Sequence, residues 1–162
     1  MNIIVAVDKN WAIGFQNKLL NSIPEDMKFF RETTTGHVVV MGRKTLESFP
    51  NGRPLKNRTN VVITRQKDYK VPGAVVVHSV EEALEYLKAF KSEDIYVIGG
   101  ASIYEQALPF ADKLYLTIVE KEPEHADTFF PEINPAEWEV TEKEMRNENG
   151  LPFTFLTLYR KQ

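Results

Sequence analysis

Short runs of β-branched residues that alternate with helical patterns constrain the fold of this chain more than any other feature. Strand patterns occupy residues 2–7, 37–41, 60–64, 74–78, 95–100 and 113–119, and helical patterns occupy 23–35, 43–49, 81–90 and 102–108. Runs such as 38–40 are apolar at consecutive positions, as expected of strands that helices cover on both faces. The strand–helix–strand order predicts a parallel sheet.

The C-terminal segments 138–146 and 151–160, joined by Asn-Glu-Asn-Gly, predict an antiparallel hairpin. We therefore predict one α/β domain spanning residues 1–162. It should have a central mixed, mostly parallel sheet of about eight strands, flanked by the four helices and closed by the hairpin.

The composition is that of a globular protein, with 43% hydrophobic and 27% charged residues in a chain of 162. The first apolar run, residues 3–7, is too short for a signal peptide, and no run is long enough to cross a membrane. The absence of cysteine excludes disulfides, thiolate nucleophiles and cysteine-ligated metals. It suits a reducing compartment, so we expect a cytoplasmic protein.

Positive charge is concentrated in one part of the chain. Residues 43–70 hold eight Lys or Arg against two acids, although the whole chain has a net charge of −3. Such a block indicates an anionic ligand, and a solvated basic surface is the alternative explanation. Nucleic acid is the weaker candidate, because the rest of the chain is acidic and lacks a basic-aromatic platform.

Four predicted strands end in residues suited to phosphate. They are followed by Gly42 to Thr45, by Thr64 and Arg65, by His78, and by Gly99 to Ser102. Ligands of α/β sheets bind at these carboxyl ends, glycine allows close backbone approach, and Arg offers a bidentate fork. Each segment alone is also explained by a turn or a helix cap. Neither the P-loop nor the Gly-x-Gly-x-x-Gly pattern occurs, which argues against a P-loop ATPase and a standard Rossmann dehydrogenase.

Two adjacent acids begin the predicted helix 23–35. With about 100° per residue, Ile23, Met27, Phe30 and Thr34 form one stripe. Glu25 lies opposite this stripe, where solvent and a Ser22…Glu25 capping pattern explain it. Asp26 falls about 60° from the centre of the stripe. The helix dipole alone also favours an acid in a first turn, so the pattern leaves the role of Asp26 open.

Other chemistries find little support. His37, His78 and His125 lack metal-ligand spacing, and neither a zinc-protease motif nor a nucleophile elbow is present. Residues 8–21 show no period and predict a long loop after the first strand, placed as a lid over a site.

Six motifs in order resemble dihydrofolate reductases of the bacterial chromosomal type. They are A-V-D-x-N-x-x-I-G, I-P-E-D-M-x-x-F, V-V-M-G-R-K-T-x-E-S, R-P-L-x-x-R-T-N-V-V-I-T, V-I-G-G-A-x-I-Y and D-T-F-F-P. The resemblance runs from Ile3 to Tyr159. It implies reduction of 7,8-dihydrofolate to 5,6,7,8-tetrahydrofolate with NADPH, in support of one-carbon and thymidylate metabolism. It also implies a monomer that binds antifolate inhibitors.

The resemblance assigns Asp26 to the pterin, as the only ionisable side chain of that pocket, with Thr117 hydrogen-bonded nearby. Arg58 is expected to pair with the α-carboxylate of the glutamate tail. The implied substrate-binding residues are Ile4, Val5, Asp26, Met27, Phe30, Phe49, Leu55, Arg58, Ile98 and Thr117.

For NADPH, the resemblance implies a nicotinamide site, a pyrophosphate cradle and an adenosine-phosphate site, with a cis peptide between Gly99 and Gly100. The corresponding residues are Ala6, Ile13, Gly14, Asn17, Leu19, Gly42, Arg43, Lys44, Thr45, Thr64, Arg65, His78, Ile98, Gly99, Gly100, Ala101, Ser102, Ile103 and Tyr104.

The chain departs from the family at the end of the 8–21 loop. Leu19-Leu20-Asn21 stands where the family usually has Leu-Pro-Trp. The proline that stiffens the loop and the indole that anchors a water are both missing, so we expect changes in loop dynamics and proton delivery. Leu19 and Asn21 join Asp26 as candidate catalytic residues, with Asn21 placed to hold the water.

Two other functions remain open from the residues alone. A related reductase acting on a ribosylated pyrimidine would share the NADPH cradle but would not need Asp26 with its helix or Arg58. A module that binds a nucleotide without turnover would need no acid in its pocket.

Overall fold

The structure is a computed structural model of the whole chain, which describes residues 1–15, 18–19, 23–122 and 125–162. Its strands are β1 (Asn2–Asp8), β2 (Ala12–Phe15), β3 (Lys18–Leu19), β4 (Val38–Gly42), β5 (Thr59–Ile63), β6 (Ala74–Val77), β7 (Ile95–Gly99), β8 (Lys113–Val119), β9 (Thr128–Phe129), β10 (Trp138–Glu148) and β11 (Leu151–Arg160). Its helices are α1 (Pro24–Thr34), α2 (Arg43–Glu47), α3 (Val80–Leu87) and α4 (Ala101–Ala107), with 3₁₀ turns at Pro50–Gly52, Ser92–Asp94 and Leu108–Phe110. None of the helices in these described ranges is long and apolar enough to cross a membrane.

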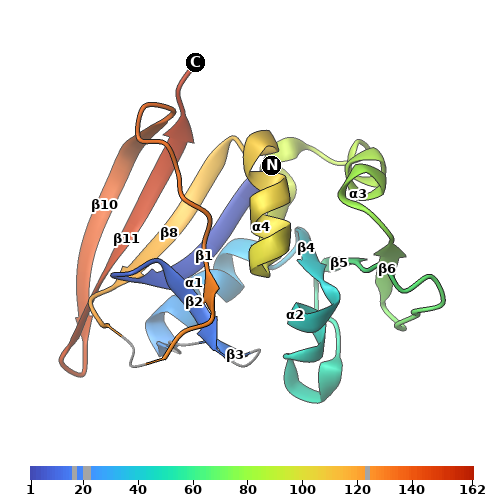
Figure 1. Cartoon of the computed structure of the whole chain (residues 1–162), viewed down its shortest axis with the longest axis horizontal. Helices are drawn as coiled ribbons and strands as arrows, with labels where there is room; N and C mark the ends of the chain where they lie inside the picture. Colours follow the sequence, from blue (N-terminus) through green and yellow to red (C-terminus); the bar gives the residue numbers. More distant parts are fainter. Residues whose placement is uncertain (16–17, 20–22, 123–124) are drawn as a thin grey trace.

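The main sheet has eight strands in the order β10-β11-β8-β1-β7-β4-β5-β6. The six strands from β8 to β6 in this order are parallel. β11 pairs antiparallel with β8 on one side and with β10 on the other. The predicted fold class, including the closing hairpin, is therefore confirmed. Figure 1 shows α4 in front of this sheet and α1 behind it.

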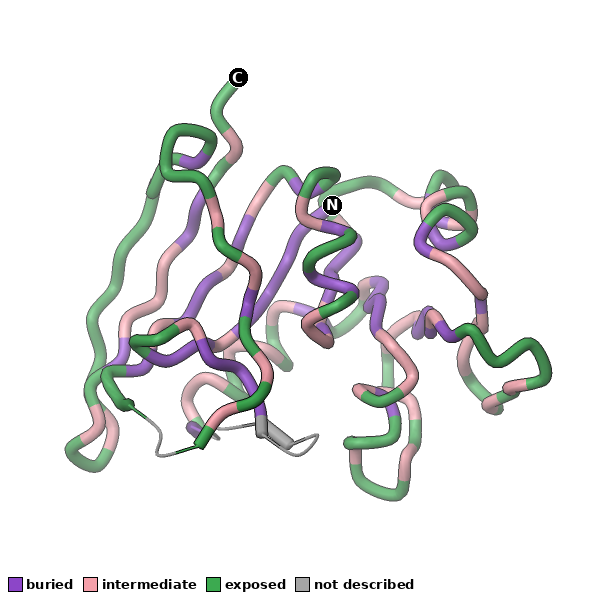
Figure 2. Tube along the Cα trace, viewed as in Figure 1, coloured by how far each residue is buried: buried purple, intermediate pink, exposed green. Residues whose placement is uncertain are grey.

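Consecutive residues of the central strands pack into two different hydrophobic cores, one on each face of the sheet. This explains why these strands are apolar at consecutive positions in the sequence. In β4, Val38 and Val40 pack with side chains of α3 and α4, whereas Val39 and Met41 pack with Leu46 of α2. Most residues of the middle strands are therefore buried, whereas β10 is exposed along nearly all its length (Figure 2).

The segment 8–21, predicted as a loop, instead holds two short strands. β2 pairs antiparallel with both β3 and β9 in a second, three-stranded sheet. Asp8 starts this turn, because its Oδ1 accepts the main-chain N–H groups of Asn10 at 2.8 Å and Ala12 at 2.9 Å. The expectation was wrong because β9 lies more than 100 residues further along the chain and strands of two to four residues leave no readable period.

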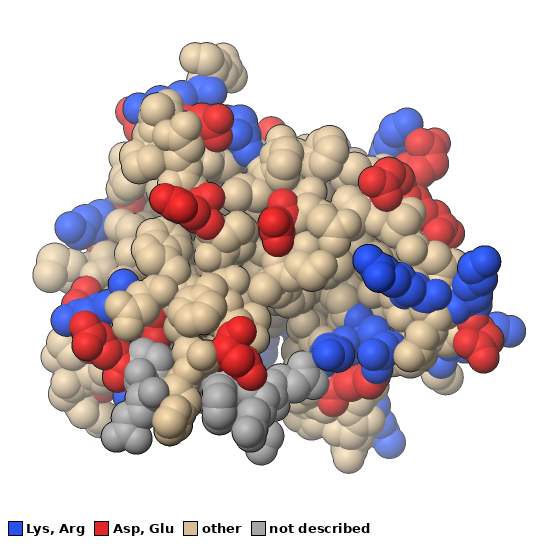
Figure 3. Space-filling view, in the orientation of Figure 1, with Lys and Arg blue, Asp and Glu red and all other residues tan. Residues whose placement is uncertain are grey.

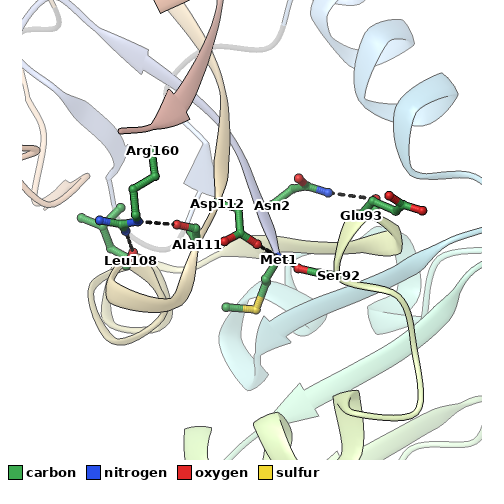
Figure 4. A network of polar contacts seen from close by, with 8 residues as sticks. All are labelled: Met1, Asn2, Ser92, Glu93, Leu108, Ala111, Asp112 and Arg160. Carbon is green, nitrogen blue, oxygen red and sulfur yellow. Dashed lines mark hydrogen bonds and ion pairs between the residues drawn. The ribbon is translucent and has the colours of Figure 1, made fainter. Parts of the chain in front are cut away.

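A polar network joins the end of β11 to the turn before β8 (Figure 4). The Arg160 guanidinium donates from Nε to Ala111 O at 2.8 Å and from Nη2 to Leu108 O at 2.5 Å, and it stacks 4.4 Å from the ring centroid of Trp138. Asp112 of the same turn accepts from the main-chain ammonium of Met1 at 2.7 Å. The network fixes the turn that leads into β8 and therefore the register of that strand.

We expect Arg160→Ala to lower the free energy of unfolding by about 2 kcal/mol, because it removes two charged hydrogen bonds to backbone carbonyls and a cation–π contact. Lys161→Ala is the matched control, because this exposed residue bonds to the described part of the chain through its main-chain N–H, which donates to Glu137 O. That control should change stability by about 0.5 kcal/mol or less. Urea denaturation measures both, and equal losses would contradict the role given to Arg160.

Candidate active site

Helix α1 begins one residue later than the predicted capping pattern requires. Ile23 occupies the N-cap position without a side-chain hydrogen bond, and Pro24 opens the first turn. Ser22 lies outside the described residues, so its part in the predicted capping pattern stays a prediction. Proline suits this position because a first-turn N–H has no helical partner to lose.

The two acids of this helix have different surroundings. Glu25 is partly exposed, as predicted, but it also forms a solvent-exposed ion pair with Arg146 of β10. The sequence could not show this contact, because 121 residues separate the two side chains. Ile23 and Thr34 of the predicted stripe are buried, Phe30 is half-buried, and Met27 is 52% exposed. One side of the stripe thus opens outward at Met27.

Asp26 turns toward the sheet, where Thr117 of β8 meets it. The Thr117 hydroxyl donates to Asp26 Oδ1 at 2.7 Å, as predicted. Burial raises the pKa of the Asp26 carboxyl above its ordinary value, and the Thr117 hydrogen bond opposes this shift. Oδ2 of Asp26 has no hydrogen-bond partner in the described part of the chain.

A buried tyrosine lies in the same region. Tyr104 of α4 donates from Oη to the main-chain oxygen of Ile4 in β1 at 2.9 Å. Burial, with a smaller contribution from the negative charge of Asp26, raises the pKa of Tyr104 far above its usual range. This phenol is therefore a neutral hydrogen-bond donor that ties α4 to the middle of β1.

The predicted apolar walls fall into two groups. Phe49, Leu55 and Ile98 pack together against the core of Val39, Met41, Leu46 and Val62. Val5 packs instead into the core on the α3 and α4 side of the sheet, so only its main chain can face a ligand on the α1 side.

Arg58 follows this apolar wall and points back to α1. Its Nη1 donates to Thr34 Oγ1 at 3.2 Å, and its Nε donates to Lys56 O at 2.9 Å. Burial and the nearby charge of Arg31 lower the pKa of the Arg58 guanidinium. Nη2 has no protein partner among the residues that the structure describes, so it can take a carboxylate oxygen. Thr34 and Arg31 were not among the predicted site residues, although both lie on the helix that carries Asp26.

The two glycine segments meet because β4 and β7 are neighbours. A Cβ on Gly42 would lie 3.3 Å from Ile103 Cγ1, and a Cβ on Gly99 or Gly100 would lie 3.4 or 3.5 Å from Thr45 Oγ1. The peptide bond between Gly99 and Gly100 is cis, as predicted. Any side chain at these three glycines would thus occupy the space between the two segments. Without side chains, main-chain atoms line this space as a cradle, which fits a pyrophosphate.

The basic residues lie at the ends of the neighbouring strands β4, β5 and β6. His78 Nδ1 lies 3.0 Å from Thr64 O, which places this ring beside the exposed Arg65. Arg43 forms an ion pair with Glu47 of its own helix. Lys and Arg side chains gather over this part of the surface (Figure 3). No cluster of three potential metal ligands occurs among the described residues.

The nicotinamide side is described only in part. Ala6 is half-buried, Ile13 and Gly14 are buried, and the main-chain oxygen of Gly14 accepts from Asp127 N at 3.1 Å. Leu19 pairs with Gly14 through the main chain of β3. Asn17, Asn21 and the side chain of Leu19 lie outside the described residues, so their roles stay predictions.

Comparison with known proteins identifies the family. The family model described as dihydrofolate reductase matches residues 1–160. The chain belongs to the dihydrofolate reductase family. Its reaction is the NADPH-dependent reduction of 7,8-dihydrofolate to tetrahydrofolate.

Individual relatives match over their full length. The dihydrofolate reductase of Haemophilus influenzae is 42% identical, with 99% of this chain and 98% of that protein covered. That of Staphylococcus aureus is 38% identical, with 100% and 99% covered. The structure of the Enterococcus faecalis enzyme, complexed with NADP(H) and RAB-propyl, has a TM-score of 0.89 at 36% identity and covers 99% of this chain and 96% of that one.

We expect Asp26→Asn to stabilise the ligand-free protein at neutral pH. The folded chain raises the pKa of Asp26 above 3.8, so ionisation of this carboxyl costs folding free energy at pH values above the folded pKa. The amide keeps the shape without the charge. Urea denaturation should show the variant to be more stable than wild type at pH 7. The difference should shrink as pH falls through the folded pKa toward 3.8, where folded and unfolded chains are both protonated. A less stable variant at pH 7 would contradict this account.

Proposed function

We propose that Asp26 holds and orients the pterin ring of dihydrofolate in this reaction. The observation that carries the proposal is a half-buried carboxylate with one oxygen bound by Thr117 and the other without a hydrogen-bond partner among the described residues. A carboxylate accepts two parallel hydrogen bonds from the pterin N3 and 2-amino groups, which is the planar pairing it makes best. The ligand then supplies hydrogen-bond donors to a carboxylate that burial partly shields from water.

The charge of Asp26 also serves the proton step. Bound NADPH supplies the hydride that reaches pterin C6. The negative carboxylate favours a positive charge on the ring and so favours protonation at N5, with water delivering the proton. Thr117 keeps the carboxylate in one orientation, because its hydroxyl holds Oδ1. Asn21 is proposed to position the water that the usual tryptophan would anchor.

The remainder of the substrate would extend from Asp26 toward Arg58. Met27, Phe30, Phe49, Leu55 and Ile98 are proposed to line the path of the aminobenzoyl ring, and Ile4 the pterin end. Arg58 would bind the α-carboxylate with its open Nη2, next to the positive charge of Arg31. Antifolates that carry a diaminopyrimidine or pteridine head would use the same carboxylate.

NADPH would lie along the carboxyl ends of β1, β7, β4, β5 and β6. Gly42 to Thr45 and Gly99 to Ile103 are proposed to surround the pyrophosphate, and Arg43, Arg65 and His78 the adenosine phosphate. Ala6, Ile13 and Gly14 would border the nicotinamide. We further propose that the protein acts as a cytoplasmic monomer with one domain.

Loss of NADPH absorbance with and without dihydrofolate tests the proposal. We expect oxidation of NADPH only when dihydrofolate is present, and inhibition by an antifolate. A protein that binds NADPH without turning over would show no loss, and a reductase of ribosylated pyrimidines would resist the antifolate.

Asp26→Asn should lower turnover near neutral pH by about 10²–10⁴-fold, because positioned acid–base assistance is lost while the helix stays in place. NADPH affinity should change by less than about threefold, because this side chain does not face the cofactor phosphates. Lower pH should restore part of the rate, since dihydrofolate protonated in solution does not need the missing charge.

Glu32→Gln is the control for this variant. Glu32 lies on the exposed side of the same helix, in a solvent-exposed pair with Lys28. Glu25 would be a poorer control, because its ion pair with Arg146 links α1 to β10. The control should keep wild-type turnover, and a variant of Asp26 with wild-type activity at pH 7 would refute the assignment.

Arg43→Ala and Arg65→Ala should each weaken NADPH binding by about tenfold or more, because charge-assisted hydrogen bonds to the 2′-phosphate are lost. NADH lacks this phosphate, so its affinity should change much less. Fluorescence titration with both cofactors measures the difference. Equal losses for NADPH and NADH would show that these arginines do not read the 2′-phosphate.

A further inference from the structure

One residue of the R-P-L-x-x-R-T-N motif has no role in the site described above. Asn60 is the second residue of β5, between β4 and β6, where it pairs with Val39 and Ala74. It is only 2% exposed, although strands of this type normally bury apolar side chains. A buried amide is costly unless its polar atoms are bonded, so the partners of Asn60 indicate what it does.

All the partners that the structure gives the Asn60 side chain are main-chain groups of residues 55 and 58. Oδ1 accepts from Leu55 N at 3.0 Å. Nδ2 donates to Leu55 O at 2.9 Å and to Arg58 O at 3.2 Å. The amide thereby uses both of its N–H groups and its oxygen on one short segment, and only this orientation of the amide suits an N–H and two carbonyls.

This segment lies outside the helices and strands of the described chain. Residues 53–58 run from the 3₁₀ turn at Pro50–Gly52 to β5 without forming a helix or strand, and Asn57 turns the chain with a φ of 60°. Gly36 N donates to Asn57 O at 2.7 Å on its other side. The side chain of Asn60 therefore replaces the ladder that would otherwise fix the main chain of Leu55 and Arg58.

Leu55 and Arg58 are the two residues of the segment that the proposed function uses. Leu55 packs in the apolar wall, and Arg58 reaches Thr34 of α1 with its open Nη2 beside it. We propose that Asn60 is a positioning residue for the substrate: without contact to dihydrofolate, it sets where Leu55 and Arg58 meet the aminobenzoyl-glutamate tail. This inference rests on the proposed function, because it takes Arg58 as the partner of the tail carboxylate.

Two variants of Asn60 test this role. Asn60→Ser shortens the side chain so that it cannot span the segment. Asn60→Asp keeps its size and the acceptor for Leu55 N but sets an oxygen against the carbonyls of Leu55 and Arg58. Asn2→Ser is the matched control, because Asn2 is also a buried amide that donates to a main-chain carbonyl, that of Glu93 at 3.0 Å (Figure 4). Asn2 lies level with Asn60 in the sheet, but β7 and β4 separate their strands.

Steady-state kinetics should separate binding from chemistry. For Asn60→Ser we expect KM for dihydrofolate to rise about tenfold, with kcat within about twofold, because a misplaced Arg58 loses a charged hydrogen bond to the tail while Asp26 keeps the ring. Asn2→Ser should leave both constants unchanged even if it lowers the unfolding midpoint as much. Assays run well below that midpoint keep every variant folded, and circular dichroism checks this. If Asn60→Asp does not fold, Asn60→Ser alone carries the test.

A truncated substrate distinguishes positioning of the tail from a merely structural role of Asn60. A simple 6-methyl-7,8-dihydropterin has the reducible ring but neither the benzoyl ring nor the glutamate. Its kcat/KM should be the same in wild type and Asn60→Ser within about twofold. Equal losses with both substrates, or an unchanged KM for dihydrofolate, would overturn the proposal.

A double-mutant cycle with Arg58→Gln identifies the route of the effect. In the Arg58→Gln background, Asn60→Ser should raise KM for dihydrofolate by clearly less than in wild type, because the group it positions is already gone. A full tenfold rise in both backgrounds would show that Asn60 does not act through Arg58. Failure of the proposed function would look different, because wild type itself would then not oxidise NADPH with dihydrofolate.

Discussion

The pairing of β1 with β8 on one side and β7 on the other is the constraint on which the site depends. β8 brings Thr117 level with Ala6 of β1, and β7 brings Gly99 next to Met41 of β4. The acid-binding hydroxyl, the glycine cradle and the start of α2 thus reach one edge of the sheet from segments far apart in the chain. Because parallel strands end together, fixing their register also fixes the distances between these groups.

The sequence predicted the sheet well because its central strands carry their signal locally. Four consecutive apolar residues in 38–41 leave few alternatives to a strand covered on both faces, and the asparagine-glycine turn at 149–150 marks the hairpin. The inward face of Asp26 was also predictable, since helical geometry relates it to Ile23 and Met27 without any knowledge of a partner.

What the sequence could not predict depends on contacts made across long stretches of chain. The strand β2 can be recognised only from its pairing with β9. The helical position of Glu25 predicts a solvent-facing side chain but not its ion pair with Arg146 of β10. Asn60 reads as one polar residue in an apolar strand, because its partners are main-chain atoms that leave no pattern in the sequence. Local periodicity thus identifies the helices and strands. Polar side chains that hydrogen-bond to distant main-chain atoms can be identified only from the structure.

One residue of the site, Asp26, lowers the stability of the ligand-free protein. Asp26 is half-buried, and the described residues give its side chain one hydrogen bond, although a fully paired or apolar residue would stabilise α1 better. A ligand that pairs with this carboxylate would therefore stabilise the folded chain, as the proposed role of Asp26 requires.

The two outer strands of the main sheet have consequences for how molecules of this protein meet one another. Each outer strand offers a row of unpaired N–H and C=O groups, which invites strand addition by a neighbour. β6 limits this by being only four residues long. β10 is eleven residues long, but Glu139, Glu142, Lys143 and Glu144 crowd it with charge that an incoming copy would have to desolvate. The charge on β10 therefore opposes edge-to-edge pairing at the outer strand that is long enough to support it.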